Sequence, residues 1–148
     1  RLISTILNFS SNFFGVFTLF TSTSGVLKVP RFAAAFSPAV ITQGGRTVWL
    51  AGQTTTTDLD GRDISGDFSA QAHACFSLID QTLRRLDGTL DNLVTMTVFI
   101  NDPRFGDQFV KIRSEKFSSG KYPASALITV SHFARPGIVI EIQAVAVI

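Results

Sequence analysis

Residues 138–148 are the segment that most constrains this chain, because nearly every side chain in it is apolar. The side chains alternate with a period of two, which predicts a β-strand with two distinct faces. One face carries Ile138, Ile140, Ile142, Ala144 and Ala146, and the other carries Val139, Glu141, Gln143, Val145 and Val147. Apolar residues on both faces need cover on both sides, and the single carboxylate among them needs a partner.

Strand and helix signals alternate from Phe36 onward. Two short β-prone runs, 39–42 and 47–51, flank Gly44-Gly45 and predict a hairpin, because glycine takes positive φ without cost. Residues 93–100 predict a strand with Val94, Met96, Val98 and Ile100 on one face, and with both faces at least partly covered. Residues 126–130 predict a further strand before the final one.

Two helices separate these strands. The first follows a polar loop at 54–67, with Asp67 or Ser69 as its cap and Gly88 as its end. Its apolar stripe consists of Ala72, Cys75, Phe76, Ile79, Leu83 and Leu86. The second starts at Pro103 and ends near Phe117, with a stripe of Phe105, Phe109 and Ile112. The order β-β-α-β-α-β-β predicts an α+β sandwich, with two helices on one face of a mixed sheet.

The chain has 148 residues and is 45% hydrophobic, which suits one compact domain. Its first 30 residues differ from the rest: five of the 14 phenylalanines fall within positions 9–20, and no acidic residue precedes Asp58. We therefore divide the chain into an apolar extension, 1–30, and a domain, 31–148. For the first part we favour an extra pairing strand, a chain-specific extension or upstream sequence outside the functional domain over a signal or transit peptide. Its apolar run at 13–20 is too short to span a bilayer, so no membrane partner is expected.

Composition and motifs exclude several function classes. A net charge of +2 is too small to make nucleic acid the expected partner. The single Cys75 forms no intrachain disulfide, and His73 and His132 have no third ligand at metal spacing, so no metal is expected. No glycine-rich nucleotide motif occurs, so no cofactor is expected. The default location is cytoplasmic.

Three segments together resemble the YjgF/RidA family, also called reactive-intermediate deaminases or L-PSP endoribonucleases: Ala51-Gly52-Gln53, residues 97–102 and residues 122–148. The resemblance covers roughly 32–148 and implies the family's chorismate-mutase-like fold. It also implies a homotrimer with small-molecule clefts between neighbouring subunits. A symmetric oligomer would cover the second apolar face of the sheet. A monomer with that face in water is the alternative.

The resemblance assigns roles to four residues. Glu141 matches the family glutamate that helps to activate the water attacking an imine carbon. The alternative is that Glu141 pairs with an arginine or a backbone amide at a subunit interface. Phe36 aligns with the cleft tyrosine, and Gln53 and Phe99 lie in segments beside the cleft. We take all four as site residues, with Glu141 as the catalytic one.

One position departs from the family. After Pro-Ala the family carries an arginine that grips the carboxylate of a 2-imino acid, and this chain has Ser125. A hydroxyl brings no charge, so we expect little hydrolysis of simple 2-imino acids and a less acidic ligand. Arg135 is the best substitute cation in the sequence, ahead of Arg31, Arg104 and Lys121.

Three hypotheses follow. The first is hydrolytic deamination of an enamine or imine other than a simple 2-imino acid. The second is a non-catalytic trimer that binds a small ligand or regulates. The third is endoribonuclease activity, against which the weak basic balance and the lack of an aromatic-basic motif argue.

Overall fold

The structure is a computed structural model that describes residues 35–117 and 119–148. Four strands form one mixed sheet in the order β1-β4-β2-β3. They are β1 (Thr47–Gln53), β2 (Leu93–Ile100), β3 (Ala124–Thr129) and β4 (Ile140–Val147). Strand β4 is antiparallel to both neighbours, whereas β3 runs parallel to β2 at the edge. The predicted extension, 1–30, lies outside the described residues.

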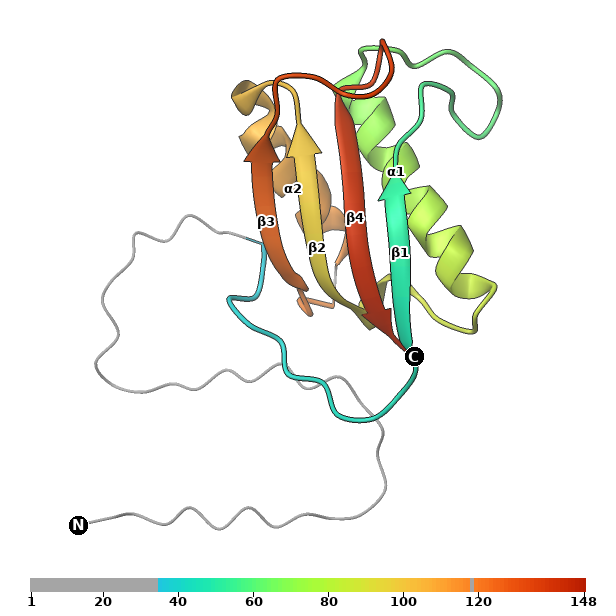
Figure 1. The fold of residues 1–148 in the computed structure, drawn as a ribbon, viewed down its shortest axis with the longest axis vertical. Coiled ribbons are helices and arrows are strands. Elements are labelled where there is room, and N and C mark those ends of the chain that lie inside the picture. The colour runs from blue at the N-terminus through green and yellow to red at the C-terminus, as the bar shows by residue number, and fades with distance from the viewer. Residues whose placement is uncertain (1–34, 118) are drawn as a thin grey trace, which may run out of the picture.

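Both long helices lie on the same face of the sheet (Figure 1). They are α1 (Phe68–Arg84) and α2 (Gly106–Lys116), and short 3-10 turns at Leu90–Asn92 and Pro103–Phe105 precede β2 and α2. The predicted α+β sandwich, with two helices on one face of a mixed sheet, is thereby confirmed. We call the other sheet face, which no helix of the described residues covers, the open face.

The core lies between the helices and the sheet. The alternation predicted for the final strand is confirmed, since Ile140, Ile142 and Ala146 are fully buried on the helix side. Opposite them, α1 contributes the predicted stripe from Ala72 to Leu83 and α2 contributes Phe109, whereas the predicted Leu86 lies beyond the end of α1 and is exposed. The helix cap is also as predicted, because the Asp67 carboxylate accepts a hydrogen bond from the Ala70 amide at 2.9 Å. The sequence period therefore located the buried faces of β4 and α1.

The predicted first strand, 39–42, is wrong. Gly44 and Gly45 do take positive φ, but they lead into Arg46, which exchanges backbone hydrogen bonds with Ile148. Ahead of them, the Ser37 amide donates to the Pro123 carbonyl at 3.0 Å, beside β3. Because β3 and β1 are opposite edges of the sheet, the chain crosses from one edge to the other. A two-stranded hairpin with β1 is therefore not formed.

Two further predictions need correction. A bulge between Leu93 and Thr95 turns Leu93 into the core in place of Val94. Gln71 lies outside the apolar stripe predicted for the first helix, yet it is fully buried. Its amide donates to the carbonyls of Ile64 and Gly137 and accepts from the Val139 amide. These three bonds satisfy buried backbone groups, which explains a polar residue in the core.

Cys75 allows a test of this packing. Burial first, and the nearby Glu141 charge second, raise the pKa of the thiol from 9.0 to about 12. The unfolded thiol ionises above pH 9 while the folded one does not, so this contribution to stability is complete below pH 9 and is lost as pH rises toward 12. The loss is at most about 1.4 kcal/mol per pH unit. We expect urea unfolding of Cys75→Ala to depend less steeply on pH between 9 and 10 than that of the parent protein; equal slopes would contradict the burial.

Candidate functional site

Glu141 is half-buried on the open face, and its position depends on a glycine in the neighbouring strand. Its cross-strand partner in β2 is Phe99, and its side chain reaches over Gly52 in β1. A Cβ atom at position 52 would press on the carboxylate Oε1 and lie 2.8 Å from Cδ. Among residues 35–117 and 119–148 the carboxylate has no hydrogen bond or ion pair. An unpaired, half-buried carboxylate is able to accept a proton from a bound water.

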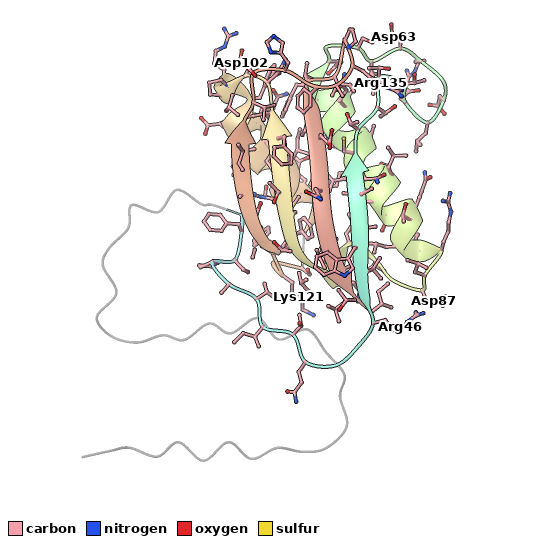
Figure 2. The ribbon with its side chains drawn as sticks, viewed as in Figure 1. Arg46, Asp63, Asp87, Asp102, Lys121 and Arg135 are labelled. Atoms are coloured by element: carbon pink, nitrogen blue, oxygen red, sulfur yellow. The ribbon has the colours of Figure 1, made fainter. Side chains whose placement is uncertain are left out.

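Gln53 lies at the end of β1, in register with Ile142, and its amide donates to the Ala51 carbonyl at 3.0 Å. The predicted residues Gln53, Phe99 and Glu141 therefore gather where β1 and β2 end and β4 begins. Arg135 is exposed in the loop between β3 and β4, at this same end of the sheet (Figure 2). The structure thus groups four of the predicted residues at one end.

Ser125 and Phe36 belong to a second group, around an arginine that sequence analysis did not consider. Ser125 pairs with the buried Met96, so its side chain points to the helix face. There its Oγ accepts a hydrogen bond of 2.8 Å from Nη1 of Arg113 in α2. The Arg113 Cζ lies 5.9 Å from the centroid of the Phe36 ring. The Ser125 hydroxyl brings no charge of its own, but it contacts a guanidinium.

The residue spacing in the second helix indicates that Arg113 lies on its buried side. It follows Phe109 by four residues, so both lie on one side of a helix, and Phe109 was assigned to the buried stripe. The guanidinium was overlooked because a charged residue is ordinarily placed in water.

Among the cations proposed from sequence, the three that the structure describes make no hydrogen bond with Ser125. Arg104 is paired with Asp102, through a 2.9 Å bond from Nε to Oδ2. Arg135 and Lys121 lie at opposite ends of the sheet, and both are exposed (Figure 2). Arg31 lies outside the described residues. The cation that contacts Ser125 is Arg113 instead.

One copy of the chain keeps the two groups apart. Ser125 of β3 pairs with Met96 of β2, whereas Glu141 of β4 pairs with Phe99 of β2. Phe99 lies three residues farther along β2 than Met96. Three residues of a strand span about 10 Å. The two side chains also point to opposite faces of the sheet. A site that used both Glu141 and Ser125 would need a second copy of the chain.

The described residues give little support for a metal site, a cysteine nucleophile or a membrane-spanning helix. His73 lies in α1 and His132 follows β3, and nowhere in residues 35–117 or 119–148 do three histidine, cysteine or acidic side chains cluster to hold a metal. The raised pKa of Cys75 disfavours its thiolate as a nucleophile. Neither α1 nor α2 has the length and apolar character to cross a membrane.

Comparison with known proteins identifies the family. Residues 27–148 match the model of the family described as Endoribonuclease L-PSP. A RutC family protein of Pyrococcus abyssi is 26% identical over 119 residues, covering 80% of this chain and 91% of that protein. Protein DfrA of Myxococcus xanthus is 28% identical over 122 residues, covering 81% and 90%. The crystal structure of YyfB from Yersinia pestis, a Rid-family protein of unknown function, has a TM-score of 0.75 at 23% identity, covering 90% of this chain and 98% of that one. The chain therefore belongs to the Endoribonuclease L-PSP family, the YjgF/RidA family that its sequence resembles.

Proposed function

We propose that this chain is a homotrimer with small-molecule clefts between its subunits, in which Glu141 positions a water that hydrolyses an imine or enamine. The observation that supports this is the Glu141 carboxylate, half-buried over Gly52 and beside Phe99, with no partner in the described residues. The carboxylate takes one proton of the water as the water oxygen bonds to the imine carbon, while the C=N π electrons move to nitrogen, which gains a proton to give the carbinolamine. Glu141 then returns its proton to the amine nitrogen as the C–N bond breaks and the hydroxyl proton leaves, which gives ammonia and the carbonyl product.

Assembly would complete the site. The two groups of predicted residues lie on different faces of one chain, so a cleft that contains both requires a neighbour. The open face also leaves large apolar side chains in water, notably Trp49 with 79% of its surface exposed and Ile128 with 43%. Exposed apolar patches of this kind are typical of an interface between subunits.

Trp49→Glu is therefore expected to dissociate the trimer to monomers, because it would place a charge inside a subunit interface. Light scattering coupled to size exclusion measures the mass directly. Leu59→Glu is the matched control, since Leu59 is 63% exposed in the loop before α1. If the parent protein is already a monomer, or if Trp49→Glu leaves a trimer intact, the proposed assembly is wrong.

The test of the reaction is ammonia release from imines and enamines generated in situ, both with and without a carboxylate next to the C=N carbon. Turnover of any of them by the parent chain supports hydrolysis. Ser125, which stands where the family arginine would be, favours a second candidate, a trimer that binds a small ligand without turning it over. Saturable binding of such a compound with no ammonia release would favour that candidate.

The name of the family would suggest a third activity, the cleavage of RNA. A net charge of +2 argues against a nucleic-acid surface. Incubation of the purified trimer with single-stranded RNA is expected to leave the RNA intact. We place the protein in the cytoplasm, where a single buried thiol stays reduced.

A further inference from the structure

Glu141 is the only charged residue in the four strands of the sheet. It is half-buried on the open face and makes no ion pair with any described residue. Arg113, a buried cation, lies on the helix face beside Ser125 and likewise forms no ion pair with a described acidic residue. The sheet therefore separates these two charges. A partly desolvated charge without a partner is unfavourable, and a bound group of opposite charge would relieve it.

The row of residues that crosses the sheet beside Glu141 is apolar. Glu141 pairs with Phe99 in β2, and Phe99 pairs with Ile128 in β3. These side chains share the open face, because Val98 and Ile100 on either side of Phe99 are buried in the core. Cross-strand side chains start about 5 Å apart, so a group bound to the carboxylate also contacts the Phe99 ring. The face of an aromatic ring attracts cations. This row thus favours a ligand with a positive head and an apolar body.

The proposed reaction also requires a hydrogen that the neighbouring side chains do not provide. The carbinolamine nitrogen carries one hydrogen more than the nitrogen of a neutral imine, and Glu141 already holds the proton of the water. Phe99 and Ile128, in register with Glu141, have no ionisable hydrogen, and Gly52, under the carboxylate, has no side chain. A protonated imine brings the hydrogen with it.

We propose that the substrate of this site is a protonated imine, a cation with an apolar body and no carboxylate. The inference rests on the proposed function, since it takes Glu141 as the group that activates water. One carboxylate oxygen accepts a hydrogen bond from the N–H of the cation, and the other takes a proton from the water. As the water oxygen bonds to carbon, the C=N electron pair moves to nitrogen and neutralises its charge. The product is the neutral carbinolamine, formed without an additional acid.

A carboxylate on the substrate would be repelled by Glu141. The four strands contain no lysine or arginine, so the open face offers such a group no cation. Arg135, in the loop before β4, is exposed and forms no ion pair with the described residues. The less acidic ligand predicted from Ser125 is consistent with this surface.

The probe for this site is butyramidine, whose amidinium is a planar cation that mimics a protonated imine and resists hydrolysis. Calorimetric titration of the full chain compares it with butyramide, the neutral amide of the same size, and with butyrate, the anion. Butyramidine is expected to bind saturably, and the other two at least about tenfold more weakly. Glu141→Gln should weaken butyramidine binding by a factor of about 30 or more, the usual result of truncating a charged contact. Glu115→Gln, at an exposed position of α2, should bind butyramidine as the parent does.

Butyramidine binding no tighter than that of butyramide or butyrate would overturn the proposed ligand class, and so would unchanged butyramidine binding in Glu141→Gln. The comparison of the three compounds on the parent protein uses no variant, so it decides the ligand class even if Glu141→Gln does not fold.

Binding requires no turnover, so the titration distinguishes two failures. If butyramidine binds through Glu141 and no imine is hydrolysed, the proposed hydrolysis is wrong and the ligand class stands. If imines are hydrolysed while butyramidine binds no better than butyramide, the hydrolysis stands and the ligand class is wrong.

Discussion

Glu141→Gln is expected to lower kcat by a factor of about 10²–10⁴ on any imine that the parent protein hydrolyses, the usual contribution of a general base. The amide keeps the size of the side chain but does not accept a proton from the attacking water. The Glu141→Gln protein should keep its fold, because the Glu141 carboxylate makes no hydrogen bond or ion pair within the described residues. Steady-state ammonia release measures kcat. Glu115→Gln, on an exposed position of α2, is the matched control and should have no effect.

Gly52→Ala tests the same role through geometry. The new methyl group would collide with the Glu141 carboxylate and displace it, while leaving its chemistry intact. Because the colliding atoms are at the end of a flexible side chain, the loss of stability should be small compared with the loss of turnover. Gly106→Ala is the control, since a methyl there meets only Leu127, at an ordinary 3.8 Å. Full activity in both Glu141→Gln and Gly52→Ala would exclude Glu141 from the reaction.

Ser125→Arg is expected to lower the free energy of unfolding by about 3–5 kcal/mol, the cost of an uncompensated charge inside a protein. The substitution introduces the arginine that the sequence resemblance predicts at this position. In this fold, however, Ser125 Oγ lies 2.8 Å from Nη1 of Arg113, so two guanidinium groups would meet in one buried place. Urea unfolding followed by circular dichroism gives the change. Thr129→Arg, at an exposed position of the same strand, is the control.

The exchange of both residues, Ser125→Arg with Arg113→Ser, returns the neighbourhood to a single positive charge. We expect it to recover most of the stability that Ser125→Arg loses, because the like-charge contact is gone. If Ser125→Arg is as stable as the parent chain, the two positions do not face each other and the arrangement around Arg113 is wrong.

Much of the fold was predictable because the relevant signals are local. The alternation in 138–148 identified the buried face of β4, and Asp67 capped α1 as expected. These predictions depend on neighbours within a few residues, which the chain places at known spacings. The predicted hairpin at 39–51 failed for the opposite reason. A tie between Ser37 and Pro123 holds the segment beside β3, and no local pattern reports such a contact.

For the candidate site, too, the sequence predicted some features and only the tertiary structure decided the others. Sequence motifs nominated Glu141, Ser125 and Phe36 by resemblance, but the two groups to which they belong follow from strand order and register. For Arg113, the sequence indicated only that the residue lies on the buried side of a helix. Its significance comes from where α2 packs, against the start of β3.

The sequence by itself determined the two faces of β4, the residue that caps α1 and the family to which the chain belongs. Tertiary structure alone decided that Gly52 leaves room for Glu141 and that Arg113 meets Ser125 without an acidic partner. The physical reason is that such contacts join residues brought together by burial of the whole core. The distances between such residues depend on how the strands and helices pack, and not on the separation of the residues in the sequence.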